Sequence, residues 1–381
     1  MAARLSIGLR YKHQEAWTGG VYYVRNLVSA LGLLPPERQP RLLVVGGDAE
    51  ALAELKAATG YGDLRRLSRA RIDRVPAPRL LFAQPQGEEI ALTLMGSPPG
   101  LEDRGVQWVP DFQEHRFPEF FDEAELTARH QRNTDWFARH RHVMVSSEDV
   151  AADFRRFYPQ STAQVHVVRF ASFLPAGAGD ADISALRAQY GLPERYFLCA
   201  NQIWRHKNHG VVLRALAEAG PAAPTVAFTG REDDYRDPAY APSVRALAGE
   251  LGIGSRVRFL GFIPREDQLA LMRGAVAIVQ PSLCEGWSTV VEDAKALGRH
   301  VLASGIAVHR EQLAEGADFF EPHDAGALAA LLLRYAEADP PVVTLDYQAA
   351  RQRFADDLWR MIGEVARDLR RRRVDRLVIT S

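Results

Sequence analysis

The sequence is poor in the features that mark several large classes of protein. It holds only two cysteines, Cys199 and Cys284, in 381 residues, which excludes a disulfide framework or a cysteine-based metal site and favours a reducing compartment. The formal net charge of -1 gives the chain as a whole no electrostatic preference for nucleic acid. No apolar run approaches about 18 residues, and the N-terminal residues lack the apolar segment of a signal peptide. We therefore expect a cytoplasmic protein that does not span a membrane.

What the sequence does contain is an alternation of short apolar runs and helical patterns. Most of the apolar runs are continuous, which is typical of parallel strands covered on both faces. Both halves of the chain are therefore predicted to be α/β. The runs are residues 4–10, 41–47, 142–147 and 164–170 in the first half, and 195–201, 225–230, 256–261, 275–282 and 299–304 in the second.

The length of the chain predicts two domains rather than one. A stretch rich in Pro, Gly and Asp at 173–184 separates the two series of strands. We predict a first domain over residues 1–173 and a second over 174–349. Ligands of open parallel sheets bind beyond the carboxyl ends of the strands, so the segments that follow strands are the first candidates for a site.

Three acidic residues lie close together in SLCEGWSTVVEDAKALG, residues 282–298. Thr289 and Glu292 match a capping box with Thr289 as the N-cap. At about 100° per residue, Glu292 lies opposite the apolar face of this helix and Asp293 lies about 90° from it. We therefore expect Glu292 to face solvent, and Asp293 to face a cleft together with Glu285. The alternative is that both helical acids only favour the helix N-terminus.

Cationic side chains gather after another predicted strand, in NQIWRHKNHG at 201–210. Arg205, His206, Lys207 and His209 lie at the end of that strand, where positive charge suits a phosphate or diphosphate. The histidine spacing also fits a metal, but no second Cys or His cluster completes such a site, so no metal is predicted. A solvated loop is the remaining alternative.

Two other segments carry weaker signals. Gly19 and Gly20 open a predicted helix, where backbone N–H groups can approach a ligand closely, although a Gly pair is also a common turn. Residues 108–121 place His115 among aromatic side chains and prolines. This composition suits a sugar and equally suits a packed surface loop.

Arginine gathers in two stretches, at 63–80 and at 370–373. Such clusters suit an anionic membrane surface, here the inner face, or a phosphorylated acceptor. The alternative is that both are solvated faces. The arginines concerned are Arg65, Arg66, Arg69, Arg71, Arg74, Arg79 and Arg370 to Arg373.

Taken together, these segments resemble a retaining glycosyltransferase of the GT-B fold, in glycosyltransferase family 4 (glycosyl transferases group 1). The most specific element, EGWSTVVEDAKALG, is similar to that family's E-x7-E segment, with Glu285 on the first glutamate and Asp293 on the second. NQIWRHKNH resembles the family's diphosphate clamp of an arginine and a lysine. Lys207 matches the lysine, but Gln202 stands where the arginine is usual. We infer that Arg205 supplies the missing charge.

The resemblance implies a role for each of these residues. Glu285 would contact hydroxyls of the transferred sugar, Asp293 the ribose, and Lys207 the diphosphate, with His115 beside the reacting sugar. The backbone N–H groups of Ser288 and Thr289 would meet the distal phosphate, and the loop at 261–267 would approach the base. The other implied donor-site residues are Gln202, Gly19, Gly20, Gly286, Trp287, Ser288, Thr289, Phe262 and Ile263.

The resemblance also implies a fold and a reaction. Two Rossmann-like domains would face each other across a cleft, with the acceptor bound by the first, the donor by the second, and a C-terminal segment of about 350–381 returning to the first. The reaction would move a hexose from a UDP- or GDP-sugar to a glycan, glycolipid or other hydroxyl acceptor without a metal or other cofactor, in polysaccharide, O-antigen or glycolipid assembly. A nucleotide-sugar epimerase of the same fold and a non-catalytic nucleotide-sugar or glycan-binding partner remain as alternatives.

Overall fold

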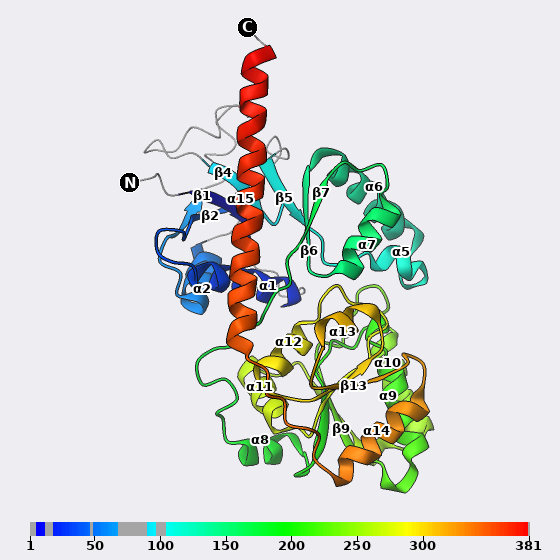
Figure 1. The fold of residues 1–381 in the computed structure, drawn as a ribbon. Helices are drawn as coiled ribbons and strands as arrows, with labels where there is room; N and C mark the ends of the chain where they lie inside the picture. The colour runs from blue at the N-terminus through cyan, green and yellow to red at the C-terminus, as the bar shows by residue number, and fades with distance from the viewer. Residues whose placement is uncertain (1–4, 12–17, 46–48, 68–89, 97–103, 380–381) are drawn as a thin grey trace. The chain divides into compact units, whose positions relative to one another are not determined.

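The computed structural model describes residues 5–11, 18–45, 49–67, 90–96 and 104–379. The chain divides into two compact units. Each contains a parallel sheet flanked by helices, so the predicted α/β class is confirmed (Figure 1). The first unit comprises Met1–Phe112, Thr127–Phe173 and Gln348–Ser381, and the second comprises Gln113–Leu126 and Leu174–Tyr347.

The first unit is built on a seven-stranded sheet in the order β3-β2-β1-β4-β5-β6-β7. The sequence predicted β1, β2, β6 and β7 but not β3, β4 and β5, whose apolar runs are short or interrupted. The strands are β1 (Ser6–Arg10), β2 (Arg41–Val45), β3 (Leu64–Leu67), β4 (Ile90–Leu94), β5 (Gly105–Trp108), β6 (His142–Val145) and β7 (Gln164–Val167). The main helices are α1 (Thr18–Gly32), α2 (Ala49–Thr59), α6 (Glu123–Arg139) and α7 (Glu148–Phe157), with the start of α6 grouped with the second unit.

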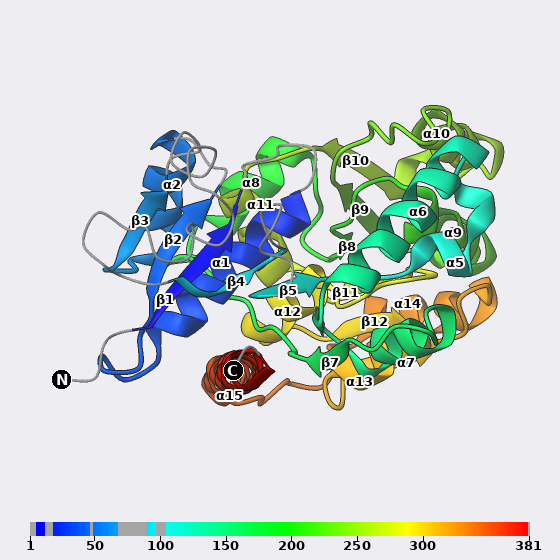
Figure 2. The same cartoon turned by 90° about the horizontal axis from the view of Figure 1, so that it is seen from above.

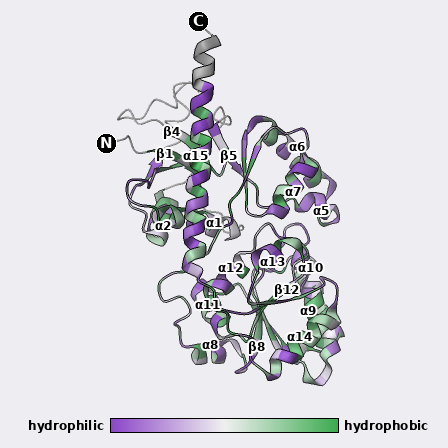
Figure 3. Ribbon diagram, viewed as in Figure 1, coloured by the Kyte–Doolittle hydropathy of each residue, from purple (hydrophilic) through white to green (hydrophobic). Residues whose placement is uncertain are grey.

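The C-terminal helix α15 (Tyr347–Ile379) packs on the first unit, as predicted. Figure 2 shows it end-on, and Figure 3 shows the mixture of hydrophilic and hydrophobic residues along it. Its buried apolar residues recur every three or four positions, which is the spacing of one helix face. These are Phe354, Ala355, Leu358, Met361, Ile362 and Val365. Arg351 Nε also donates to the backbone oxygen of Ser172 over 3.0 Å.

The second unit has a six-stranded sheet in the order β10-β9-β8-β11-β12-β13. All of its strands except β13 were predicted. They are β8 (Tyr196–Cys199), β9 (Thr225–Thr229), β10 (Val257–Gly261), β11 (Ile278–Gln280), β12 (Val301–Ser304) and β13 (Ala317–Phe320). The main helices are α8 (Ile183–Tyr190), α9 (His209–Ala219), α10 (Tyr240–Glu250), α11 (Arg265–Gly274), α12 (Thr289–Ala296), α13 (Ala307–Gln312) and α14 (Ala325–Glu337).

The segment 113–126, which includes α5 (Gln113–Arg116), groups with the second unit, whereas the sequence boundary assigned it to the first. Its main attachment is Arg236, whose side chain is buried. Arg236 Nη1 donates to Gln113 Oε1 over 2.7 Å, and the guanidinium lies 5.1 Å from the centroid of the Phe121 ring. Contacts of this kind join residues more than a hundred positions apart, so a boundary drawn from composition alone misses them.

The arginine-rich stretches are only partly within the described residues. Arg69, Arg71, Arg74 and Arg79 lie outside them. Arg65, which is exposed, pairs with Asp63 over 3.0 Å, and Arg372 pairs with Asp368. In the described part of the chain, no helix is both long and apolar enough to cross a membrane.

Candidate functional site

The order of the strands in the second unit marks one point on the sheet edge. From the central strand β8 the chain builds outward through β9 and β10, then returns to place β11 on the other side of β8. The loops that leave β8 and β11 therefore diverge, and such a switch point is where open parallel sheets bind ligands. The loop after β8 carries Lys207, and the loop after β11 carries Glu285.

Lys207 and Glu285 form an ion pair at this point. Nζ of Lys207 lies 2.5 Å from Oε1 of Glu285, with the two side chains 16% and 9% exposed. Gln280 Nε2 and Ser282 Oγ also donate to Oε1 of Glu285, over 2.9 and 2.7 Å. All three hydrogen bonds therefore end on Oε1, and none of them uses Oε2. An ammonium group and a carboxylate oxygen are what a phosphate and a sugar hydroxyl require.

The charge state of this pair follows from its surroundings. Burial raises the pKa of Glu285, but the Lys207 ammonium and the Ser282 hydrogen bond outweigh burial and hold that pKa below its ordinary value. His309 is close enough to act electrostatically on Glu285, and burial lowers the pKa of His309 itself. At neutral pH the carboxylate is therefore ionised and the imidazole is neutral.

His309 was not singled out from the sequence, although it lies on α13 behind the Glu285 turn. Ser304 Oγ donates to the backbone oxygen of Ser282 over 2.5 Å, so it can only accept from His309. Nδ1 of His309 lies 2.9 Å from the backbone oxygen of Ser304, another acceptor, and therefore carries the proton. Its Nε2 is buried without a partner among the described residues. The sequence signal for His309 would have been a lone histidine after a strand, which is weak.

Helix α12 begins differently from the prediction. Ser288, not Thr289, is the N-cap, and its Oγ accepts from Val291 N over 3.4 Å. The expected capping box is therefore wrong by one residue. The Ser288 N–H was expected to meet a phosphate, but it donates to Gln312 Oε1 over 3.0 Å. The next N–H groups, beginning with Thr289, belong to the first helical turn and have no partner within the helix.

The predicted division of the two helical acids, with Glu292 in solvent and Asp293 facing a cleft, differs from the structure, which buries both. Glu292 was expected in solvent, but it is 1% exposed and accepts from Lys295 Nζ over 2.7 Å and from Tyr347 Oη over 2.6 Å. The face of α12 opposite the core is covered by α13 and by the chain near Tyr347, which the helical phase alone does not reveal. Asp293 is also 1% exposed, and Arg265 Nη2 donates to it over 2.5 Å. Asp293 therefore lies behind a guanidinium rather than open to a cleft.

Residues 182–352 match the family model described as Glycosyl transferases group 1. These residues form a glycosyl transferases group 1 domain. Among curated proteins, the O-antigen chain mannosyltransferase RfbU of Salmonella typhimurium is 26% identical over 170 residues, which are 45% of this chain and 46% of RfbU. The D-inositol 3-phosphate glycosyltransferase of Streptomyces avermitilis is 28% identical over 227 residues, 56% and 48% of the two chains. The chain spans about half the length of these curated relatives.

Solved glycosyltransferase structures resemble the chain over nearly its whole length. A glycosyltransferase from Rickettsia africae has a TM-score of 0.64 at 16% identity, over 96% of this chain and 97% of that one. Anabaena HepE, solved in complex with UDP-glucose, has a TM-score of 0.63 at 17% identity, over 96% and 99%. At these identities the likeness shows the fold, and the predicted GT-B class is confirmed.

The other residues considered for contact with the diphosphate lie in the loops after β8 and β9. Gln202 is half-buried in the first of them. Arg205, the predicted replacement for the clamp arginine, is 47% exposed and pairs with Asp237 over 2.8 Å. Arg231, which the sequence analysis missed, follows β9, and its backbone oxygen accepts from Ile203 N over 2.8 Å. This bond holds Arg231 beside the Gln202 loop.

Arg231 also meets the loop expected near the base. Its guanidinium lies 4.5 Å from the centroid of the Phe262 ring, which is 61% exposed, while Ile263 is buried in the core. Nε of Arg231 is buried without a hydrogen-bond partner in the described part of the chain. An exposed aromatic ring beside a cation offers a stacking surface for a base and a charge for a phosphate.

The predicted residues outside this group are placed as follows. Gly19 and Gly20 lie in the first turn of α1 in the first unit, so they open a helix as predicted, and a Cβ at Gly19 would meet no atom within 4 Å. His115 is half-buried in α5. Gly286 and Trp287 complete the turn between Glu285 and Ser288, with Lys295 Nζ 5.9 Å from the Trp287 ring.

The two histidines considered for a metal are both buried in the second unit. Burial lowers the pKa of His206 well below its ordinary value and that of His209 to about 3. The His209 ring packs 5.5 Å from the ring of Phe228. Across the residues that the structure describes, no group of three or more His, Cys, Asp or Glu side chains is arranged to hold a metal ion.

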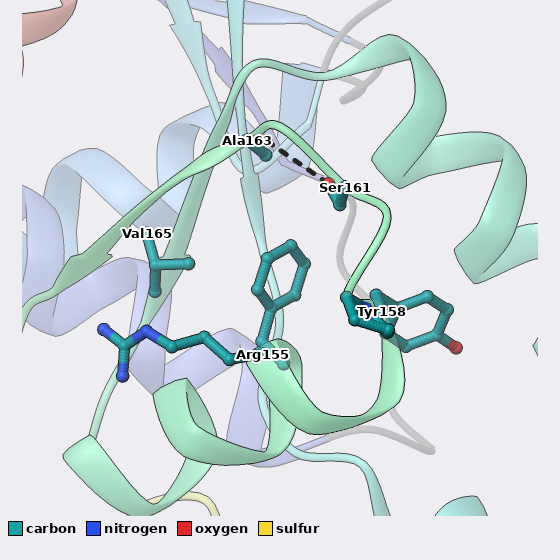
Figure 4. A pocket seen from close by; sticks show the side chains of 7 residues that line it. Arg155, Tyr158, Ser161, Ala163 and Val165 are labelled. Atoms are coloured by element: carbon teal, nitrogen blue, oxygen red, sulfur yellow. Dashed lines mark hydrogen bonds between the residues drawn. The ribbon is translucent and has the colours of Figure 1, made fainter.

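A hollow of about 280 Å³ in the first unit is separate from these residues. It lies between the end of α7 and the start of β7, and Figure 4 shows Arg155, Tyr158, Ser161 and Val165 around it. None of the predicted site residues lines this hollow. It is therefore not part of the candidate site.

Proposed function

We propose that the chain is a retaining glycosyltransferase that moves a hexose from a UDP- or GDP-sugar to an acceptor hydroxyl. The observation that carries the proposal is the largely buried Lys207–Glu285 pair at the switch point of a domain that matches the glycosyl transferases group 1 model. The pair supplies one cation for a diphosphate and one carboxylate oxygen for a sugar hydroxyl at adjacent positions.

The chemistry assigned to this site is stabilisation of the leaving group. As the bond between the anomeric carbon and the phosphate oxygen breaks, negative charge grows on the diphosphate. Lys207 and the first N–H groups of α12 would stabilise that charge in a geometry fixed in advance. The acceptor oxygen forms the new bond on the same face, and its proton passes to the departing phosphate oxygen. No side chain of the protein is required as a nucleophile, and no metal is required to neutralise the diphosphate.

Glu285 would bind the transferred sugar through Oε2, since Oε1 is occupied by three donors. Asp293, held by Arg265, would bind the ribose, and Phe262 would stack on the base with Arg231 beside it. Of the two candidates for the charge missing at Gln202, Arg231 has the better support, because its side chain is less exposed than that of Arg205 and its contact with an acid is looser. Arg231 lies 3.9 Å from Asp233, whereas Arg205 lies 2.8 Å from Asp237.

The first unit would bind the acceptor, and its Gly19 and Gly20 would lie near the diphosphate. His115, which groups with the second unit, would lie near the reacting sugar. The acceptor we propose is a growing glycan or glycolipid, because one relative is named an O-antigen chain mannosyltransferase. We propose that the transfer takes place at the inner face of the membrane, a location that fits such an acceptor.

The proposal is tested first by thermal melting with UDP-, GDP- and dTDP-sugars, since a ligand of the native state raises the melting temperature. The stabilising donor is then incubated with hydroxyl acceptors, and the anomeric configuration of the product is determined by NMR. We expect Lys207→Ala to lose most transfer while Lys56→Ala, an exposed lysine on α2, is unchanged. Formation of an epimer from the donor alone would identify an epimerase, and donor binding without turnover on any acceptor would identify a non-catalytic partner.

A further inference from the structure

The turn that carries Glu285 ends at Ser288, and this residue is held from behind by a single side chain. Gln312, the last residue of α13, accepts from the Ser288 N–H at Oε1 over 3.0 Å and donates from Nε2 to the Ser288 backbone oxygen over 2.8 Å. Gln312 is 3% exposed and Ser288 2% exposed. The carboxamide thus pairs with both backbone groups of one residue, as a neighbouring strand would. We call this pairing the Ser288 clamp.

The clamp itself is fixed by a buried acid. The second Nε2 proton of Gln312 is donated to Oε1 of Glu292 over 3.0 Å, and Lys295 Nζ donates to the same oxygen over 2.7 Å. Lys295 Nζ also donates to the backbone oxygen of Gln312 over 3.1 Å. Because Nε2 faces two acceptors and Oε1 faces a donor, the carboxamide can take only one orientation. Tyr347 Oη closes the network by donating to Oε2 of Glu292 over 2.6 Å.

The clamp acts on the residue that joins two parts of the site. Ser288 follows Glu285 by three positions and caps α12 through its Oγ, so its N–H, its carbonyl and its hydroxyl are all engaged. With Ser288 immobile, the N–H groups of Thr289 and the next residue have fixed directions. Donors that are fixed in advance stabilise a developing anion far better than donors that must reorganise.

We propose that Gln312 is a positioning residue for the diphosphate subsite, and that Glu292 acts through it. This inference rests on the proposed function, because it assigns the clamp to the part of the donor that carries the phosphates. Glu292 was expected to lie in solvent, and its burial beside Gln312 is what leads to this assignment. A network that only stabilised the fold would affect all ligands of the domain alike.

The test compares ligands with and without phosphates. By calorimetry, Gln312→Leu, which leaves both backbone groups of Ser288 unpaired, is expected to weaken nucleoside diphosphate binding by about tenfold or more. Binding of the matching nucleoside is expected to change by less than about twofold, because the nucleoside makes no contact with the turn. Donor kcat should fall as well. Uridine with UDP and guanosine with GDP are the probes.

Two further variants keep the test decisive if Gln312→Leu folds poorly. Tyr347→Phe removes only the outermost bond of the network and is expected to give a smaller loss in the same direction. Tyr335→Phe removes a bond of 2.5 Å to Asp318 in the same unit, outside the network, and is expected to leave both affinities unchanged.

Each outcome has a separate meaning. Equal weakening of nucleoside and diphosphate by the Gln312 and Tyr347 variants would overturn the positioning role, as would no change in either. If the unmodified protein binds no nucleoside diphosphate at all, the proposed function fails and this inference fails with it. If the unmodified protein binds the diphosphate and the variants do not discriminate, only this inference fails.

Discussion

The cluster around Glu285 in the second unit can be compared with a cluster of histidines and acids in the first unit, and the two differ in how completely they are paired. In the second unit, the donors that the described residues offer to Glu285 all converge on Oε1 and leave Oε2 unused. In the first unit, His142 Nδ1 lies 3.1 Å from His166 Nε2, and the outer ring nitrogens lie 3.0 Å from Asp368 and 3.3 Å from Glu364. We call the latter group the histidine seam.

The difference follows from where the clusters lie. The histidine seam joins β6 and β7 to α15, so every ring nitrogen faces a partner on another element and neither imidazole has a nitrogen left for a ligand. The Glu285 cluster lies in the loops at the carboxyl ends of β8 and β11. A buried acid with an unused oxygen at a strand end therefore indicates a ligand, whereas a saturated cluster between elements indicates docking.

The largest expected effect is on Glu285. Glu285→Gln removes the charge that pairs with Lys207. With its carboxamide oxygen turned toward the three donors, it also places an NH2 group where Oε2 would accept from a sugar hydroxyl. We expect sugar transfer to fall by about a hundredfold or more, measured as kcat/KM for the donor. His166→Gln, the matched change in the histidine seam, should lower the melting temperature and leave transfer by the folded protein within about twofold.

Glu285→Gln and His166→Gln together test whether the two clusters differ in function. If His166→Gln loses as much transfer as Glu285→Gln at a temperature where both are folded, the seam is not a docking cluster only. If Glu285→Gln keeps near-full transfer, the unused oxygen does not mark a substrate.

The next effect concerns the nucleoside end of the domain. Asp293→Ala leaves the Arg265 guanidinium without its buried acid and removes the proposed ribose acceptor. We expect affinity for the nucleoside and for its diphosphate to fall together, by about tenfold or more, measured by calorimetry. Glu292→Gln, one residue away, should weaken the diphosphate alone. If Asp293→Ala and Glu292→Gln change the affinities for nucleoside and diphosphate in the same way, the two acids do not have separate roles.

A smaller effect is expected from pH. Burial, with repulsion from His142, lowers the pKa of His166 to about 4. In the unfolded chain the ring titrates near its ordinary pKa of about 6.5, so the unfolded state binds an extra proton between these values and stability falls as pH falls. This residue should contribute a loss of about 1 kcal/mol in the free energy of unfolding from pH 7.5 to 5.5.

The measurement is the melting temperature against pH for the unmodified protein and for His166→Gln. Buried histidines of the second unit, such as His206 and His209, are present in both proteins, so the difference in slope isolates the seam. Because the pKa of Glu285 is held below its ordinary value, donor affinity should persist over this range. If the melting temperature falls with pH equally steeply in the two proteins, the lowered pKa of His166 does not contribute to the pH dependence of stability.

Sequence patterns predicted features that are determined by residues close together in the sequence. Continuous apolar runs identified five of the six strands of the second unit, but helical phase placed Glu292 in solvent, where the structure buries it as deeply as Asp293. Contacts between distant segments were not accessible in this way. Arg265 reaches Asp293 across 28 positions, and Tyr347 reaches Glu292 across 55. The burial of Glu292 depends on elements whose packing no periodicity within α12 can indicate.

The smallest expected effect separates the two candidates for the missing clamp charge. Arg205 is half-exposed and paired with Asp237, and surface pairs of this kind contribute about 0–1 kcal/mol to stability. We expect Arg205→Gln to change donor KM by less than about threefold. Arg231→Gln should raise donor KM more than that, because it removes both a cation and the contact with Phe262. If Arg205→Gln raises donor KM more than Arg231→Gln does, Arg205 and not Arg231 supplies the missing charge. Since Gln202 occupies the usual arginine position, Gln202→Arg should restore donor KM in the variant of whichever arginine supplies the charge.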